Sequence, residues 1–243
     1  MRILVVADVH ANLAAFKAVI EEAEREGAID RIWCLGDVVG YGAEPGECID
    51  LLNSYPNDTI AGNHDLAAAG IIGIEDFNPL AAAALTWTKT QLSPAHEEWL
   101  RGLPQTHVEH DFTLVHGSLR DPVWDYLLSP SLAEVNFRRQ DTPYCLVGHS
   151  HMPIAFRDAE GPIEGIVLAD GTAFDLDGST FVANPGGLGQ PRDGDRRSCF
   201  AMLDTDARRL EFRRVEYDVE ATQAKMGAAY LPRHLIERLA RGR

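Results

Sequence analysis

Short apolar runs alternate with amphipathic segments along residues 1–151. The runs are rich in Val, Ile and Leu, like strands that are buried on both faces, and occupy residues 2–7, 31–35, 58–61, 112–115 and 144–147. After the first run, apolar residues recur at helical spacing up to Gly27, namely Leu13, Phe16, Val19, Ile20 and Ala23. Strands that alternate with helices predict β-α-β units and a largely parallel sheet.

Proline and capping residues mark the starts of further helices. Pro45 opens a segment that runs through Leu52. Asn78-Pro79 and Ser93-Pro94 each combine a capping side chain with proline at the first helical position. We predict one more helix over residues 129–139.

The pattern changes after residue 151. Strands are predicted at 154–158, 163–168, 172–176, 180–183, 198–204 and 210–217, with turn signals at Asp170-Gly171 and Asp177-Gly178. No helix fits between them, so we expect an antiparallel sheet stacked on the first. Residues 219–243 look helical, and Pro232 begins the last segment. We therefore expect one α/β domain over residues 1–243, a two-sheet β-sandwich flanked by helices, with a C-terminal helical extension from about 219.

Composition and charge restrict the partners. The chain has 22 Lys and Arg against 37 Asp and Glu, a net charge of −15, so a long nucleic acid is not expected to bind. No apolar run approaches the ~18 residues of a membrane span. The four cysteines lack CxxC spacing and no secretory signal precedes them, so reduced thiols in a cytoplasmic protein are expected. A small anionic substrate requires a locally positive site.

A polar cluster follows each of the five apolar runs. The clusters, in chain order, are Asp8-Val9-His10, Gly36-Asp37, Gly62-Asn63-His64-Asp65, His116-Gly117 and Gly148-His149-Ser150-His151. Each one alone is a weak signal, because capping, a turn or a buried His explains it as well. Parallel strands, however, bring their carboxyl ends to one edge of a sheet, where ligands bind. Five such clusters in order predict a functional site there.

The side chains of these clusters suit metal ions. Carboxylate, amide and imidazole groups without thiolate favour Mn, Fe, Zn or Co. The candidates are more than one ion needs, and two ions that share a bridging carboxylate use them well: Asp8, His10, Asp37, Asn63, His116, His149 and His151.

The clusters resemble those of the calcineurin-like metallophosphoesterases. That family carries D-x-H, G-D, G-N-H-D/E, H-x and G-H-x-H in this order, and residues 8–151 match it throughout. Asn184-Pro185-Gly186 and Gln190-Pro191-Arg192 further resemble the bacterial and archaeal YfcE-type phosphodiesterase branch. The resemblance implies a four-layer α-β-β-α fold.

It also implies roles for individual residues. One ion would be held by Asp8, His10 and His151, the other by Asn63, His116 and His149, with Asp37 between them. His64 would stand near the leaving-group oxygen, paired with Asp65. Two divalent ions are expected, Mn²⁺ first, with Fe, Zn, Co or Ni as alternatives.

These residues suggest hydrolysis of a phosphate ester by metal-bound hydroxide at a dinuclear site. The first choice of substrate is a small or nucleotide-like phosphodiester. Two divalent ions would outweigh Asp8, Asp37 and one hydroxide and give the positive site that the acidic chain requires. Arg192, Asn12 and Tyr41 are candidate substrate contacts, although a surface Arg, a helix cap and a packed Tyr explain them equally well. Residues 71–77 and 188–195 are expected near the pocket.

Three other functions stay open at this point. A phosphomonoesterase or protein phosphatase of the same superfamily is one, but the Asp-Arg-Gly continuation of protein phosphatases is replaced here by Gly40-Tyr41-Gly42. A non-catalytic interaction scaffold is another, although all candidate ligands and His64 are present. A nuclease acting on short or cyclic nucleotides is the third. The oligomeric state does not follow from the sequence.

Overall fold

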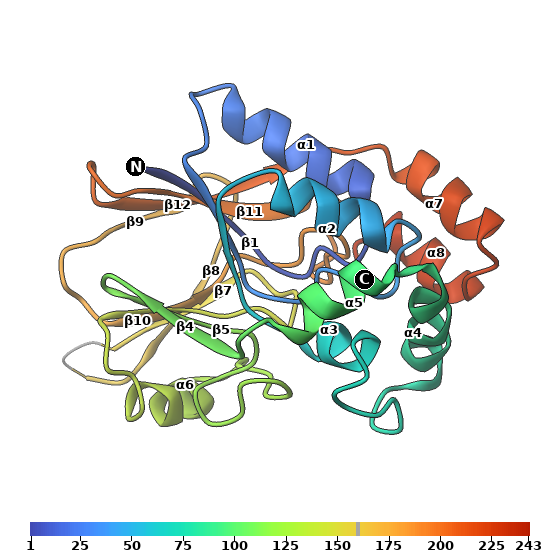
Figure 1. Ribbon diagram of the computed structural model, residues 1–243. Helices are drawn as coiled ribbons and strands as arrows, with labels where there is room; N and C mark the ends of the chain where they lie inside the picture. Colours follow the sequence, from blue (N-terminus) through green and yellow to red (C-terminus); the bar gives the residue numbers. More distant parts are fainter. Residues whose placement is uncertain (159–160) are drawn as a thin grey trace.

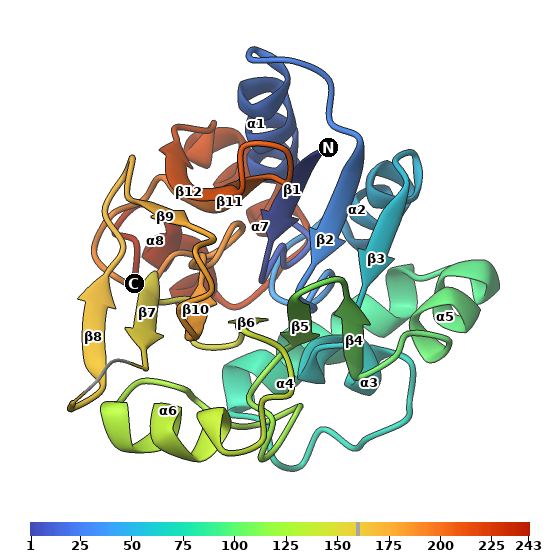
Figure 2. The same cartoon turned by 90° about the vertical axis from the view of Figure 1, so that its left-hand side faces the viewer.

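The computed structural model describes residues 1–158 and 161–243 and contains two six-stranded sheets packed face to face (Figure 1). The first sheet has the order β3-β2-β1-β11-β12-β9. Its strands are β1 (Arg2–Val6), β2 (Arg31–Cys34), β3 (Asn57–Thr59), β9 (Ala173–Asp175), β11 (Ser198–Asp204) and β12 (Arg209–Val215). Figure 2 shows β1, β2 and β3 side by side, and these three strands are parallel.

The second sheet has the order β4-β5-β6-β10-β7-β8. It contains β4 (Thr106–Glu109), β5 (Phe112–Val115), β6 (Tyr144–Leu146), β7 (Ile154–Arg157), β8 (Glu164–Val167) and β10 (Phe181–Asn184). β5, β6 and β10 run parallel, while β4, β7 and β8 pair antiparallel with their neighbours.

The expected division into a parallel first sheet and an antiparallel second sheet was wrong. Each sheet contains strands from both halves of the chain: β11, β12 and β9 extend the first sheet, and β10, β7 and β8 extend the second. The apolar pattern of a strand specifies which faces are buried but not which strand lies beside it. The short strand β4 and the short helix α3 were not predicted at all.

The residues that the structure describes form eight helices. They are α1 (Leu13–Glu24), α2 (Pro45–Asn53), α3 (Asn63–Ala68), α4 (Pro79–Gln91), α5 (Pro94–Arg101), α6 (Pro130–Phe137), α7 (Val219–Ala228) and α8 (Arg233–Leu239). The predicted caps Asn78 and Ser93 are present, since each accepts a backbone amide of the helix that follows, and Ser129 caps α6 in the same way. α7 begins at Val219, where the helical tail was predicted. No helix of the described residues combines the length and hydropathy of a bilayer span.

The core has separate layers because side chains alternate along each strand. In β1, Ile3 and Val5 belong to the cluster between the sheets, which also holds Trp33, Tyr144 and Phe181. Leu4 and Val6 point the other way, into the cluster beneath the helices that cover the first sheet. α6 covers the second sheet on the opposite side (Figure 1). All four cysteines are free and buried.

Candidate functional site

The five polar clusters meet between the carboxyl ends of the parallel strands of both sheets. Asp8 and Asp37 follow β1 and β2 of the first sheet, and His116 and His149 follow β5 and β6 of the second. Hydrogen bonds join the sheets here: the His116 imidazole contacts the Leu35 carbonyl at 2.7 Å, and the His149 amide donates to Asp8 at 3.1 Å. The site therefore depends on the seam between two sheets and not on one sheet edge.

The candidate ligands form overlapping groups with ligand atoms within 4.8 Å of one another. One group is Asp8, His10 and His151, and another is Asp37, His116 and His149. Asp37 connects them, since its Oδ2 lies 3.6 Å from His10 Nε2 and 3.4 Å from His116 Nε2. All these side chains are buried, as is Asn63.

Backbone carbonyls fix the tautomers of three imidazoles. A carbonyl only accepts hydrogen bonds, so each ring nitrogen that contacts one must carry the proton. Nδ1 of His10 contacts the Val39 carbonyl at 3.1 Å, and Nδ1 of His151 contacts the Gln190 carbonyl at 2.7 Å; His116 makes the bond described above. In the neutral rings, Nε2 then presents a lone pair to the site. This arrangement is typical of histidines that bind metals.

The imidazole nitrogens that face the site lie so close together that they require a cation between them. His10 Nε2 and His151 Nε2 are 3.1 Å apart, and two facing lone pairs repel unless a proton or a metal ion satisfies both. Such spacing is that of neighbouring ligands around one ion with bonds of ~2.1 Å. Four buried atoms of the cluster have no hydrogen-bond partner among the described residues, namely Asp8 Oδ2, Asn63 Oδ1, His116 Nε2 and His149 Nε2. The donor set fits divalent metal ions.

The protonation of the metal-free cluster supports this assignment. Burial lowers the pKa of His149 to about 3, and the pKa values of His10 and His151 also fall well below the ordinary value. Burial alone would lower the pKa of His116 too, but the Asp37 carboxylate outweighs it and raises that pKa to about 9. Burial, aided by Asp37, raises the pKa of Asp8 to about 7. Three rings are therefore neutral and ready to bind, and His116 holds a proton that a metal ion would replace.

The backbone carries left-handed conformations at five of the seven candidate ligands. The φ angles are positive at Asp8 (55°), His10 (47°), Asp37 (56°), His149 (64°) and His151 (57°). Such angles are uncommon outside glycine and cluster at functional sites. Neighbouring glycines permit the close approach, because a Cβ on Gly62 would stand 2.0 Å from Asp37 Oδ1.

His64 and Asp65 are not paired with each other, which corrects the expectation from the sequence. The Asp65 carboxylate accepts the backbone amides of Gly62 at 3.0 Å and Val39 at 3.1 Å. Nδ1 of His64 is buried without a hydrogen-bond partner, and the His64 ring packs at 4.9 Å from that of His10. Asp65 is the third residue of α3, a position from which a carboxylate reaches back to the amide before the helix. Its carboxylate therefore binds the helix start and the adjoining loop.

Asn12 is not available for contact with a substrate, which also corrects the expectation from the sequence. Its Oδ1 accepts the Ala15 amide at 3.2 Å and the Thr222 hydroxyl at 3.1 Å, and its Nδ2 donates to the Gly189 carbonyl at 2.8 Å. It is buried. The residue caps α1 and ties it to α7, so its polar groups are used inside the fold.

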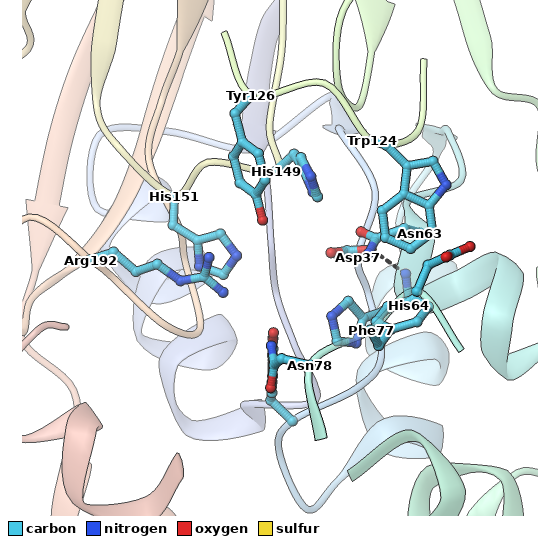
Figure 3. A pocket seen from close by; sticks show the side chains of 12 residues that line it. Asp37, Asn63, His64, Phe77, Asn78, Trp124, Tyr126, His149, His151 and Arg192 are labelled. Atoms are coloured by element: carbon cyan, nitrogen blue, oxygen red, sulfur yellow. Dashed lines mark hydrogen bonds between the residues drawn. The ribbon is translucent and has the colours of Figure 1, made fainter. Parts of the chain in front are cut away.

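Arg192 and Tyr41 do line the cleft above the cluster, and Figure 3 shows Arg192 at its border. The guanidinium carbon of Arg192 lies 5.9 Å from the centre of the Tyr41 ring, and one of its nitrogens donates to Gln190 at 3.2 Å. No carboxylate of the described residues forms an ion pair with Arg192. A half-buried guanidinium without an acidic partner is suited to bind an anion.

Two further segments complete the cleft, which encloses about 370 Å³ including space open to solvent. Asp76, Phe77 and Asn78 come from the segment before α4, close to where the sequence placed it. Trp124 and Tyr126 come from the segment after β5 and were missed. Neither lies at a motif spacing; the only signal was two aromatic residues in a stretch without strand or helix periodicity.

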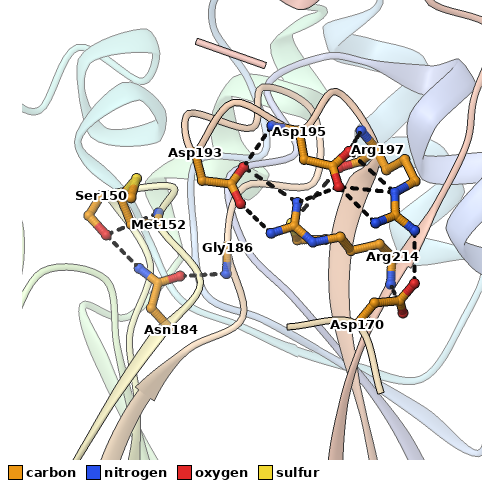
Figure 4. A network of polar contacts seen from close by, with 10 residues as sticks. Ser150, Met152, Asp170, Asn184, Gly186, Asp193, Asp195, Arg197 and Arg214 are labelled. Carbon is orange, nitrogen blue, oxygen red and sulfur yellow. Dashed lines mark hydrogen bonds and ion pairs between the residues drawn. The ribbon is translucent and has the colours of Figure 1, made fainter. Parts of the chain in front are cut away.

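Polar networks hold the turns that carry the ligands (Figure 4). Asn184 donates to the Gly148 carbonyl at 2.6 Å and to the Ser150 hydroxyl at 2.9 Å, which fixes the turn bearing His149 and His151. Arg214 pairs with Asp193 beside Arg192, and Arg197 pairs with Asp195 at 2.8 Å. The motif residue Asn184 thus supports the ligands without belonging to them.

Comparisons with known proteins agree with this geometry. The calcineurin-like phosphoesterase superfamily domain matches residues 1–208. A solved metallophosphoesterase from Sphaerobacter thermophilus is 44% identical, with a TM-score of 0.91, and the match covers 100% of this chain and 99% of that one. The uncharacterized protein MJ0912 of Methanocaldococcus jannaschii is 34% identical over 99% of this chain and 98% of its own length. A symmetrical bis(5'-nucleosyl)-tetraphosphatase of Actinobacillus pleuropneumoniae is 28% identical over 51% of this chain and 47% of its own length.

Proposed function

The chain belongs to the calcineurin-like phosphoesterase superfamily, and on this basis we propose that it hydrolyses a phosphate ester at a site for two divalent metal ions. The observation that carries the proposal is the pair of buried ligand groups joined through Asp37. In this assignment Asp8, His10 and His151 hold one ion and Asn63, His116 and His149 the other. Mn²⁺ is the first choice, followed by Fe, Zn, Co or Ni.

The metal ions would supply the nucleophile and the charge. Divalent ions lower the pKa of bound water from 15.7 toward ~7 and clamp phosphate oxygens. The chain's own residues then bind and orient the ester. Arg192 donates from its free nitrogens to a phosphate oxygen, and Asp37 balances the charge between the two ligand groups.

His64 is the candidate proton donor to the leaving group. It lines the cleft beside Asp37, and burial lowers its pKa to about 4. The ring would become protonated only when the phosphate of the substrate adds negative charge to the cleft. Its low pKa would then make the protonated ring a strong acid. General acid catalysis is typically worth 10²–10⁴-fold.

A small phosphodiester, such as a nucleotide derivative, is the proposed substrate. The relative named above is a bis(5'-nucleosyl)-tetraphosphatase, and its name supports a nucleotide-like substrate. The net charge of −15 disfavours a long polyanion. We further propose that the protein acts in the cytoplasm, with neither a membrane nor a long nucleic acid as partner.

The test is hydrolysis of bis-p-nitrophenyl phosphate beside p-nitrophenyl phosphate. The protein is stripped of metal and Mn²⁺ is then added back. We expect metal-dependent turnover with faster cleavage of the diester. Faster cleavage of the monoester would identify a phosphomonoesterase. Binding of two ions without turnover of either ester, with each of the metals named above, would favour an interaction scaffold.

A further inference from the structure

The segment 117–129 between β5 and α6 has its own internal scaffold. Asp125 accepts hydrogen bonds from Arg120 Nε at 2.8 Å and from the Ser118 hydroxyl at 2.6 Å. Asp121 accepts the backbone amide of Trp124 at 3.1 Å. These bonds fix the segment although it is neither strand nor helix, so the side chains that it points at the cleft are held in place.

One of those side chains is Tyr126. Its ring stacks on the His149 imidazole, with ring centres 4.1 Å apart and an interplanar angle of 26°. The residue is nevertheless 46% exposed, and it lines the cleft. Figure 3 shows the hydroxyl directed into the open space of the pocket, with Arg192 on one side and Asp37 on the other.

The hydroxyl is a donor without a partner in the fold. No hydrogen bond joins it to any residue that the structure describes, while the ring that carries it is fixed against a candidate metal ligand. A phosphate group bound between the His149 side of the cluster and Arg192 would offer charged oxygens within its reach. Hydrogen bonds to charged acceptors are about twice as strong as neutral ones.

We infer that Tyr126 is a further catalytic residue, whose hydroxyl donates a hydrogen bond to a phosphoryl oxygen of the substrate opposite Arg192. The inference rests on the proposed phosphoesterase function and adds a residue that lies in none of the family motifs. The ring has a separate, supporting role, since it packs on His149.

The variant Tyr126→Phe separates these roles, because it keeps the ring and removes only the O–H group. We expect kcat with bis-p-nitrophenyl phosphate to fall by about 10- to 100-fold, with two Mn²⁺ ions still bound. Tyr230→Phe is the matched control, since Tyr230 is 95% exposed on the C-terminal segment and its change should leave turnover unaltered. Wild-type turnover in Tyr126→Phe would overturn the inference and leave the proposed function standing.

A second measurement does not depend on turnover. Titration of inorganic phosphate into the Mn²⁺-loaded protein should show a roughly 10-fold weaker affinity for Tyr126→Phe than for the wild type. If the wild type hydrolyses neither ester, the proposed function fails and this titration still tests the contact. Equal phosphate affinity in the two proteins would overturn it.

Discussion

At the scale of single residues, Asp37 has the most distinctive position in the cluster. Its carboxylate faces His10 on one side and His116 on the other. Removing a group that serves both sides leaves each with fewer ligands and less negative charge. The metal affinity should therefore fall by more than the ~10–100-fold that is typical when a residue supporting a ligand is removed.

We therefore expect Asp37→Ala to lose bound metal. The measurement is Mn²⁺ content per chain after gel filtration, with Asp76→Ala as control. Asp76 is an exposed acid in the same cleft and belongs to none of the candidate ligand groups, so its variant should retain both ions. Two ions per chain in Asp37→Ala would refute the shared-ligand assignment.

His64 is expected to act on substrate and not on metal. His64→Ala should bind two ions like the wild type, while kcat falls by about 10²–10⁴-fold. The prediction is demanding, because the structure also places His64 in a group with His10 and Asp37. Metal titration and turnover on the same sample decide it. Loss of one ion in His64→Ala would make His64 a ligand.

At the scale of secondary-structure elements, Asp65 connects the start of α3 to the loop after β2. Both carboxylate oxygens accept backbone amides, those of Gly62 and Val39. In Asp65→Asn, one of these amides would face an NH₂ group and lose its acceptor. A buried donor left unpaired costs about 1–3 kcal/mol, so the free energy of unfolding should fall by that amount.

Urea unfolding of the metal-free protein measures the change. Asp218→Asn is the control, because Asp218 is an exposed cap of α7 and Asn caps a helix about as well as Asp. If Asp65→Asn is as stable as the wild type but has no activity, Asp65 has a catalytic role and not the structural role argued here.

The elements also show what the sequence was able to predict. Apolar runs followed by polar clusters predicted β1, β2, β3, β5 and β6 and the clusters that the fold brings together, because strand burial and strand ends leave local signals. Sheet order was not predictable, since β11 pairs with β1 through residues nearly the whole chain apart. The role of Asp65 was misjudged for a related reason: adjacency to His64 in sequence says nothing about which way α3 turns the two side chains.

The far side of the cleft was predicted only in part. Arg192 was found through its motif, but Trp124 and Tyr126 were not, because their segment is organised by side-chain hydrogen bonds around Asp121 and Asp125. Such bonds have no periodicity that a sequence displays. Substrate-binding segments of this kind are harder to predict than metal ligands, whose residue types and strand-end positions are fixed by chemistry.

At the scale of the whole molecule, the buried cluster should control how stability depends on pH. Burial lowers the pKa values of four imidazoles, those of His10, His64, His149 and His151. The unfolded chain therefore binds these protons more readily, and stability is lost as pH falls below the unfolded pKa of ~6.5. Asp8 and Asp65, with pKa values raised to about 7, take up protons in the folded state and offset about half of this effect.

The opposite slope is expected above neutral pH. His116, with its pKa raised to about 9, keeps its proton in the folded protein after the unfolded chain has released it. That stabilisation is complete below ~6.5 and is lost as pH rises through the folded pKa. The metal-free protein should therefore be most stable near pH 6.5–7, and each slope follows the difference in bound protons at about 1.4 kcal/mol per proton per pH unit.

Urea midpoints of the metal-free protein between about pH 5 and pH 9 test both slopes. Saturating Mn²⁺ should raise stability at neutral pH, because the ions bind the folded chain. It should also remove the alkaline decline, since an ion at His116 replaces the proton whose loss causes it. If the midpoint of the metal-free protein does not change with pH across this range, the imidazoles are hydrated and have unshifted pKa values. That result would contradict a preformed buried metal site. A decline at both ends that Mn²⁺ corrects only on the alkaline side would tie the stability of the whole sandwich to the ligands at its seam.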